Sequence, residues 1–221
     1  MTRICTTASR QPKFIALTNT TPITELPIME TFYTVQGEGF YAGRPAFFIR
    51  VAGCDVGCVW CDVKDSWDAN EHEVLQVSNL VNQVQESGTN FVVITGGEPA
   101  MYDLNYLTQE LHKLNVEIAV ETSGAYELKG EYDWICLSPK KFKKPISSVI
   151  ERANELKIIV FNKSDVKWAE EHAAQVSKDC KLYMQAEWEK KEEMYPLVLD
   201  YITRHPQWRI SVQTHKYLGV D

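Results

Sequence analysis

The sequence lacks a hydrophobic run long enough to cross a membrane, and it lacks an excess of basic residues. No apolar segment in its 221 residues approaches the roughly 20 residues of a membrane helix, and the N-terminus has no apolar core of a secretory signal. With 23 Lys and Arg against 30 Asp and Glu, the net charge of -7 argues against nucleic-acid binding by bulk electrostatics. We therefore expect a cytoplasmic protein that binds neither membranes nor nucleic acid directly.

The chain is also too short for two full domains. Its 221 residues, 44% of them hydrophobic and 24% charged, can bury one good core. Residues 1–27 are rich in Thr and contain Pro12, Pro22 and Pro27, which break any periodicity. We expect residues 1–27 to be an extension that is flexible or draped over the surface. Residues 28–221 should then form a single domain.

A fourth cysteine is missing near the three that stand closest together. Cys54, Cys58 and Cys61 have the spacing C-x-x-x-C-x-x-C, and the other three cysteines lie far away along the chain. Three such thiolates can ligate three irons of a 4Fe-4S cluster, whereas protein-held clusters and structural zinc sites take four protein ligands. The remaining iron would be open to a small molecule. The alternatives are a zinc site completed by a distant histidine such as His72, or a disulfide knot.

Short apolar, β-branched runs alternate with segments of helical periodicity along the chain. Strand, helix and strand in repetition predict a mainly parallel sheet with right-handed crossovers, either doubly wound or curled into an open or closed barrel. Ser147 and Asp165 are expected as N-caps. The expected strands are 46–51, 91–95, 116–121, 134–137, 157–161, 181–185 and 208–213, and the expected helices are 78–86, 104–114, 147–156, 165–176 and 192–204.

Glycine and polar residues follow several of the expected strands. In parallel α/β folds, ligands bind at the C-terminal ends of the strands. Within Thr95-Gly96-Gly97-Glu98-Pro99, the glycines bring backbone amides close to a ligand, and Glu98 can accept a hydrogen bond from an ammonium group. Together with the cysteine loop, these residues predict one binding site at this rim. The other strand ends carry 121–124, 138–140, 185–187 and 213–216.

The cysteine loop followed by Gly-Gly-Glu-Pro resembles the radical S-adenosylmethionine superfamily, whose members adopt partial or full (β/α) barrels. More narrowly, the sequence from about residue 28 to the C-terminus is similar to the 7-carboxy-7-deazaguanine synthase family. The resemblance implies an α/β fold, a partial (β/α)6-type barrel with a mainly parallel sheet. It rests on the segments Thr34-Val35-Gln36-Gly37-Glu38-Gly39, 47–50, 92–99, 121–124, 138–140 and 213–218.

The resemblance implies a radical S-adenosylmethionine lyase of queuosine and other 7-deazapurine biosynthesis, a tRNA modification pathway. Such an enzyme converts 6-carboxy-5,6,7,8-tetrahydropterin to 7-carboxy-7-deazaguanine with loss of ammonia. Its cofactors would be a 4Fe-4S cluster, S-adenosylmethionine and Mg2+. Its partners would be the small pterin substrate, a flavodoxin- or ferredoxin-type electron donor, and a second copy of the chain in a homodimer.

The family's cofactor positions can be carried over onto matching residues of this sequence. Cys54, Cys58 and Cys61 would hold three irons, and S-adenosylmethionine would chelate the fourth through its amino and carboxylate groups. Glu98 would receive the ammonium of its methionyl part. The full set of cofactor-binding positions beyond the cysteines is Trp60, Asp62, Gly97, Glu98, Ser138, Pro139, Lys140, Gln185, Ala186, Glu187 and Trp188.

The substrate positions follow from the same resemblance. Arg50 matches the arginine that pairs with the substrate carboxylate, a task that suits its planar, two-pronged guanidinium. The alternative for Arg50 is a strand-end residue that reaches solvent. For Glu121 and His215, direct contact with the pterin and polar scaffolding both stay open. The positions are Val35, Gln36, Gly37, Arg50, Thr95, Glu121, His215 and the C-terminal residue, Asp221.

Val63 departs from the family pattern. Family members have Thr, or sometimes Ser, directly after Cys-Asp, and its hydroxyl ligates a Mg2+ that also holds the substrate carboxylate. A hard cation takes oxygen ligands, and the valine side chain has none. Either Mg2+ is held by substrate, water and another group such as Asp62, Asp65 or Ser66, or it is dispensable here. We expect at most a weak dependence on Mg2+.

Two other classes of protein share the cysteine loop. A glycyl-radical activating enzyme acts on a protein backbone and would not need Gln36 and Arg50. The second is a non-catalytic regulatory protein on the same scaffold, which Val63 slightly favours because it lacks the expected hydroxyl. The intact cysteines and Glu98 argue against that second class, because a binding role does not require an open iron.

Overall fold

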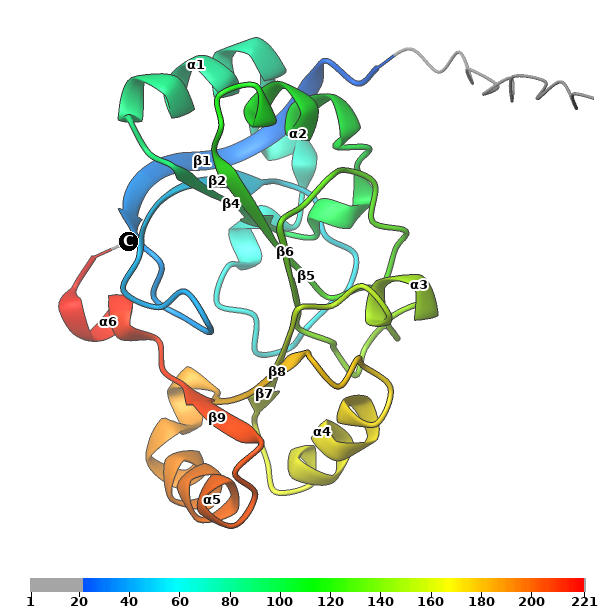
Figure 1. The fold of residues 1–221 in the computed structure, drawn as a ribbon, viewed down its shortest axis with the longest axis vertical. Helices are drawn as coiled ribbons and strands as arrows, with labels where there is room; N and C mark the ends of the chain where they lie inside the picture. Colours follow the sequence, from blue (N-terminus) through cyan, green and yellow to red (C-terminus); the bar gives the residue numbers. More distant parts are fainter. Residues whose placement is uncertain (1–21, 221) are drawn as a thin grey trace, which may run out of the picture.

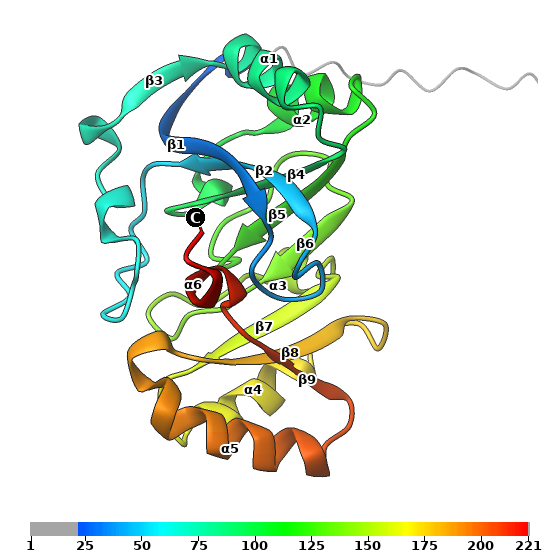
Figure 2. The same ribbon diagram turned by 90° about the vertical axis from the view of Figure 1, so that its left-hand side faces the viewer.

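A single curved sheet of nine strands forms the centre of the computed structural model, which describes residues 22–220. The strand order is β3-β1-β2-β4-β5-β6-β7-β8-β9 (Figures 1 and 2). The strands are β1 (Glu25–Val35), β2 (Pro45–Val51), β3 (Glu73–Gln76), β4 (Phe91–Gly96), β5 (Glu117–Thr122), β6 (Trp134–Leu137), β7 (Glu155–Val160), β8 (Lys181–Ala186) and β9 (Trp208–Ser211).

Helices follow most of the strands. Helices α1 and α2 lie at one end of the sheet and α4 and α5 at the other, whereas α6 lies apart from them (Figure 2). Within residues 22–220, none of the helices combines the length and the apolar character needed to span a bilayer. The helices are α1 (Val77–Ser87), α2 (Asn105–His112), α3 (Ser147–Ile150), α4 (Asp165–Ala173), α5 (Lys191–Arg204) and α6 (Thr214–Leu218), with 3-10 turns η1 (Lys64–Ser66), η2 (Ala69–Glu71), η3 (Pro99–Met101) and η4 (Trp188–Lys190).

The sheet is parallel from β2 to β9, whereas β1 pairs antiparallel with both β2 and β3. The expected α/β fold with a mainly parallel sheet in a partial barrel is therefore confirmed. Parallel pairing brings the C-terminal ends of these strands to one rim of the sheet. The loops that follow the strands therefore meet there.

The core explains why these segments fold as they do. Along β2, Phe47 and Ile49 pack into the main core on one face, while Ala46 and Phe48 pack into a smaller cluster on the other. This alternation is the period of a strand. In α1, Val77, Leu80 and Val84 are buried at helical spacing. Burial on both faces fixes the position of the central strands.

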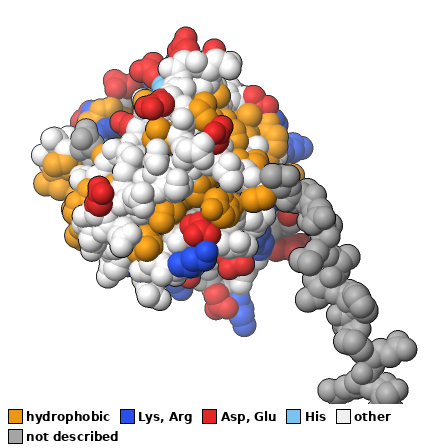
Figure 3. Space-filling view, turned by 90° about the horizontal axis from the view of Figure 1, so that it is seen from above, with side chains coloured by type: hydrophobic (Ala, Val, Ile, Leu, Met, Phe, Trp, Pro, Cys, Tyr) orange, Lys and Arg blue, Asp and Glu red, His pale blue; other side chains and the backbone are white. Residues whose placement is uncertain are grey.

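The surface seen from the side of α1 and α2 carries both signs of charge. In Figure 3, acidic and basic side chains are scattered among apolar and uncharged ones. The part of this face that the structure describes offers no large continuous basic area of the kind that binds a nucleic-acid backbone.

All seven expected strands are present, but β1 and β3 were not expected. β1 includes Pro27 and charged residues, and its burial does not alternate cleanly because both neighbours cover it only in part. β1 begins at Glu25, three residues before the expected domain start at residue 28. The rest of the extension, residues 1–21, lies outside the described residues.

The expected helix 147–156 was wrong. Helix α3 ends at Ile150, and β7 begins at Glu155. Val149, Ile150, Ala153 and Leu156 are all buried, and their spacing imitates a helix although the last belongs to a strand. The expected N-caps were also wrong.

The N-cap residues are Ile146 and Ser164. The Asp165 carboxylate instead accepts hydrogen bonds from the backbone N–H groups of Phe161 and Asn162, at 2.7 and 2.8 Å. It therefore stabilises the turn that precedes α4. Helix α6, of five residues, was not expected.

Candidate active site

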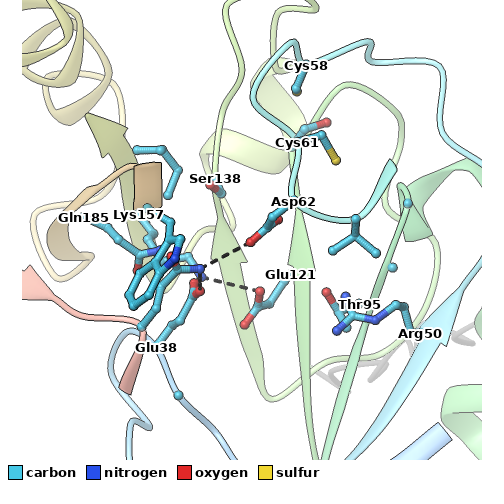
Figure 4. Close-up of a pocket in the computed structure, with 18 of the residues that line it drawn as sticks. Glu38, Arg50, Cys58, Cys61, Asp62, Thr95, Glu121, Ser138, Lys157 and Gln185 are labelled. Carbon is cyan, nitrogen blue, oxygen red and sulfur yellow. Dashed lines mark hydrogen bonds and ion pairs between the residues drawn. The ribbon is translucent and has the colours of Figure 1, made fainter. Parts of the chain in front are cut away.

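A cavity of about 390 Å3 opens at the C-terminal ends of the parallel strands (Figure 4). Its wall is formed by the cysteine loop, the β1–β2 loop and the ends of β4, β5, β6 and β8. Pro139 lines a neighbouring smaller cavity instead, and Asp221 lies outside the described residues. The predicted site residues that line the large cavity are Val35, Gln36, Gly37, Arg50, Cys54, Cys58, Trp60, Cys61, Asp62, Thr95, Gly97, Glu98, Glu121, Ser138, Lys140, Gln185, Ala186, Glu187, Trp188 and His215.

The cysteine loop is held in place by contacts on both sides. The Asp55 carboxylate accepts hydrogen bonds from the Tyr126 hydroxyl and from Lys143 Nζ, the latter at 2.8 Å. The backbone N–H of Cys54 donates to the carbonyl of Trp67, at 3.1 Å. These contacts hold the loop at the cavity through Asp55 and the Cys54 backbone, so they do not engage the three thiol groups.

The donor set of this loop fits a cluster better than a single ion. Burial raises the pKa of Cys54 and raises that of Cys58 to about 11, so a bound cation would be needed to favour the thiolates. Within residues 22–220, no three His, Cys, Asp or Glu side chains lie close enough to hold one metal ion. His72, the alternative zinc ligand, does not line the cavity, and its Nε2 lies 2.7 Å from the Asp65 carbonyl. The cysteines of this part of the chain are free thiols, not a disulfide knot.

Glu98 follows β4 and is almost fully buried. Its carboxylate accepts hydrogen bonds from the Thr122 hydroxyl and from the backbone N–H groups of Ala100 and Ser123, at 3.0 and 2.8 Å for the two N–H groups. The Ser123 hydroxyl donates to it as well. Protein donors thus fix the orientation of this carboxylate at the cavity wall. Its contact with an ammonium group stays a prediction.

Gly97 packs directly against the cysteine loop. A Cβ at this position would lie 2.3 Å from the Gly53 carbonyl oxygen and 2.9 Å from Cys54 Cβ. The backbone N–H of Glu98 also donates to the Gly53 carbonyl, at 2.9 Å. The missing side chain of Gly97 therefore serves first to bring the β4 turn and the cysteine loop together.

Two further segments of the predicted cofactor site carry internal contacts. Lys140 Nζ donates to the Ser138 carbonyl at 2.7 Å and lies 5.7 Å from the centroid of the Trp60 ring. Burial lowers the pKa of Lys140. The Glu187 carboxylate accepts from the N–H groups of Glu189 and Lys190 and so caps η4.

Arg50 and Thr95 lie side by side at the cavity, because they are partners in the parallel register of β2 and β4. The Arg50 Nε donates to the Glu30 carboxylate at 2.6 Å, and the Arg50 side chain is 19% exposed. Figure 4 shows its guanidinium beside Thr95. The guanidinium has two further nitrogens that can receive a carboxylate.

Gln36 and Glu121 are joined by a hydrogen bond of 2.9 Å from Gln36 Nε2 to Glu121 Oε1. The Oε1 of Gln36 accepts from the backbone N–H of Glu38, at 3.0 Å. Gln36 is therefore fixed from both ends, and one edge of the cavity carries a defined set of amide and carboxylate groups.

A buried ion cluster at the base of the cavity was missed by the sequence reasoning. Lys157, 3% exposed, donates to the Glu38 carboxylate and lies 3.4 Å from that of Glu121. Burial alone would lower the pKa of Lys157, but the charges of Glu121 and Glu38 outweigh it, so this pKa is raised well above its usual value. A lysine between Leu156 and Ile158 in an apolar strand was the available indication.

Glu38 belongs to the quoted Gln-Gly-Glu-Gly segment but was not assigned a role. Burial would raise its pKa, yet the charge of Lys157 and the hydrogen bonds from Lys157 and Gln213 lower it to about 2. The pKa of Asp62 is also lowered. Burial would raise it, but Lys216 Nζ, which donates to the Asp62 carboxylate at 2.9 Å, outweighs burial. Both carboxylates are therefore ionised at neutral pH.

His215, in α6, packs against Gly37 in the β1–β2 loop. A Cβ on Gly37 would lie 2.0 Å from His215 Nδ1. Next to it, the backbone N–H and the hydroxyl of Thr214 both donate to the Gly37 carbonyl at 2.9 Å. Burial lowers the pKa of His215, so the neutral imidazole is favoured.

Val63 lines the cavity, at the position for which the family resemblance implies a hydroxyl. Of the other candidate Mg2+ ligands, Asp62 lines the cavity, whereas Asp65 and Ser66 do not. The Ser66 hydroxyl is buried and donates to the Val63 carbonyl at 2.6 Å. Val63 and Ser66 thus supply no side-chain hydroxyl to a Mg2+ site at this position of the cavity wall.

The fold and the three-cysteine site together define a radical S-adenosylmethionine protein, and residues 48–158 match the model of the Radical SAM superfamily. The chain is 51% identical to the 7-carboxy-7-deazaguanine synthase of Flavobacterium psychrophilum, in an alignment that covers 88% of this chain and 92% of that protein. It is 34% identical to the 7-carboxy-7-deazaguanine synthase of Escherichia coli, in an alignment that covers 89% of this chain and 99% of that protein. A crystal structure of QueE from Escherichia coli superposes with a TM-score of 0.77 at 32% identity, over 85% of this chain and 93% of that one.

The chain belongs to the 7-carboxy-7-deazaguanine synthase family. The resemblance seen in the sequence is confirmed, and with it the class of enzyme, a radical S-adenosylmethionine lyase.

Proposed function

We propose that this protein converts 6-carboxy-5,6,7,8-tetrahydropterin to 7-carboxy-7-deazaguanine with release of ammonia, in queuosine and 7-deazapurine biosynthesis. One observation carries the proposal. A three-cysteine loop and a set of groups suited to a flat pterin carboxylate line the same cavity. Neither half alone would indicate this reaction.

The cofactor half would be held by the chain's own residues as follows. Cys54, Cys58 and Cys61 would ligate three irons, and Glu98 would accept the ammonium of S-adenosylmethionine. Together the cluster and S-adenosylmethionine supply a 5'-deoxyadenosyl radical that can remove an unactivated hydrogen. The other residues in contact with S-adenosylmethionine would be Trp60, Asp62, Gly97, Ser138, Pro139, Lys140, Gln185, Ala186, Glu187 and Trp188.

The substrate half would orient the pterin by its carboxylate and its amide edge. Arg50 would pair with the carboxylate, while Thr95 and Gln36 would contact the ring. Glu121 and His215 lie at the same cavity and would complete this site with Val35, Gly37 and the C-terminal Asp221. Fixed side chains of this kind hold the reacting carbon close to the radical and exclude water.

Mg2+ has a smaller place in this proposal. Val63 supplies no side-chain oxygen, so a cation would be held by the substrate, by water and by another group such as Asp62, which lines the cavity. We further propose that the enzyme works in the cytoplasm as a homodimer and receives electrons from a flavodoxin- or ferredoxin-type protein.

The test is an anaerobic assay of the full chain with a reconstituted cluster, S-adenosylmethionine, a chemical reductant and the carboxytetrahydropterin. We expect 7-carboxy-7-deazaguanine as product. Formation of 5'-deoxyadenosine without pterin turnover would instead indicate a glycyl-radical activating enzyme. Formation of neither product would indicate a non-catalytic regulatory protein.

A further inference from the structure

A second cavity, of about 170 Å3, borders the cysteine loop next to the active-site cavity. Its lining is mainly apolar and includes Val59, Trp60, Pro139, Phe142 and Trp168. Trp60 and Ile159 line both cavities, so these side chains form the wall between them. We call this second cavity the outer hollow.

The outer hollow is bordered by exposed apolar side chains. Val59, which stands between Cys58 and Trp60, is 66% exposed, and Phe142 is 45% exposed. The rings of Trp60 and Phe142 meet edge to face with centroids 6.5 Å apart. Exposed apolar groups gathered at a hollow mark an interaction surface. A protein seated there would touch the cysteine loop itself.

Lysines stand next to lining residues of this hollow in the sequence, although the chain is negative overall. Residues 139–145 read Pro-Lys-Lys-Phe-Lys-Lys-Pro, with four lysines and no acid, whereas the net charge of the chain is -7. Lys141 pairs with Asp165 and Lys143 with Asp55. Lys144 and Lys163 are exposed, and within residues 22–220 neither has an acidic group within 4.0 Å. Their charge is therefore available to a partner.

We propose that the outer hollow and its lysines are the docking surface for an acidic flavodoxin that delivers the electron for catalysis. The inference rests on the proposed function, because only the cluster chemistry requires an electron. The apolar dimethylbenzene edge of a flavin matches the apolar lining, and an acidic rim matches Lys144 and Lys163. One electron leaves the reduced flavin, which becomes a semiquinone, and reduces the cluster held by the cysteine loop. No bond in this chain is made or broken.

The first test measures binding directly, by calorimetric titration of oxidised flavodoxin into the full chain with its cluster. We expect Phe142→Ala and the double variant Lys144→Glu/Lys163→Glu each to weaken binding by about tenfold or more. Added salt should weaken wild-type binding, since exposed charges are screened. Matched controls are Leu199→Ala, exposed on α5, and Lys178→Glu, exposed at the turn before β8, where the opposite ends of the strands lie. Both should bind as the wild type does.

The second test compares two reductants in the same variants. With titanium(III) citrate, turnover should be unchanged in every variant, whereas with flavodoxin it should fall in the hollow variants alone. The proposal is overturned if the wild type does not bind flavodoxin, if the hollow variants bind normally, or if turnover with titanium(III) citrate falls equally. A wild type that makes no deazaguanine with either reductant refutes the proposed function, while the titration still decides the docking surface.

Discussion

At the scale of single residues, Arg50 lines the cavity and donates one guanidinium nitrogen to Glu30, which leaves two others for a substrate. In Arg50→Lys, the charge stays but the two-pronged geometry is lost. We expect kcat/KM for the pterin to fall by about 10- to 100-fold, the value of one to two charged hydrogen bonds. Steady-state kinetics with the pterin varied would measure this.

The control for Arg50 is Glu30→Gln, which removes the exposed partner and keeps the arginine. Its effect should be less than about threefold, as for surface ion pairs in general. If Arg50→Lys left kcat/KM unchanged, Arg50 would be a solvent-facing strand end and the substrate assignment would fail.

Val63 gives a second prediction at this scale. We expect the wild type to lose less than about half of its turnover when Mg2+ is removed with a chelator, because Val63 offers no oxygen ligand. Val63→Thr should gain a clear dependence on Mg2+. Val63→Ala, which changes the size but adds no oxygen, is the matched control. A strict Mg2+ requirement in the wild type would contradict this prediction.

Most of the residues predicted for the site line one cavity because they lie at or after the ends of parallel strands, which meet at one rim. Cys54, Glu98 and His215, far apart along the chain, line one cavity for this reason. The sequence could not show which polar atoms of the site form hydrogen bonds within the protein itself. The Glu98 and Glu187 carboxylates both accept several hydrogen bonds from nearby groups, and these depend on local loop geometry.

At the scale of elements, two glycines mark two different contacts between loops. Gly97 joins the β4 turn to the cysteine loop, and Gly37 joins the β1–β2 loop to His215. A methyl group at either position requires the neighbour to move, at a cost of about 1–3 kcal/mol of unfolding free energy. The two substitutions should nevertheless have different functional effects.

Gly97→Ala should lower the iron content of the reconstituted protein, because the cysteine loop must shift. Gly37→Ala should keep its iron and raise the KM for the pterin. Iron and sulfide analysis, together with steady-state kinetics, separates the two outcomes. Equal iron content in the two variants would show that Gly97 does not position the cluster loop.

The elements could be predicted only where their periodicity was regular. The buried central strands have β-branched runs on both faces, which no helix of that length would show. β1 and β3 lie at one edge and pair antiparallel, so their exposure depends on neighbours that the local sequence does not reveal. The predicted helix 147–156 was too long because Val149, Ile150, Ala153 and Leu156 are buried at helical spacing, although Leu156 belongs to β7.

At the scale of the whole molecule, Lys157 of β7 ties the β1–β2 loop to the centre of the sheet through Glu38. Removing one partner of a buried pair leaves a charge without compensation. We expect Lys157→Met to lower the free energy of unfolding by about 3–5 kcal/mol at pH 7. The double variant Lys157→Met/Glu38→Gln should lose less. Urea titrations measure both, with the exposed pair variant Asp200→Asn as a control that costs at most about 1 kcal/mol.

The same pair predicts how stability depends on pH. The pKa of Glu38 is lowered from 4.5 to about 2 in the folded protein. Its contribution to stability is therefore fully present above pH 4.5 and is lost as the pH falls toward 2. Urea titrations between these limits should show a smaller loss in Glu38→Gln than in the wild type. Equal losses would mean that Glu38 is not held ionised by Lys157.

The contact between Thr214 and Gly37 makes one wall of the cavity depend on two segments that lie far apart in the sequence. The cysteine loop lies between these segments in the sequence and lines the same cavity. A proteolytic cut before residue 214 would remove His215 and Lys216 from the cavity wall. The three thiols would then stand beside a more open cavity, in which a radical is less well protected from water.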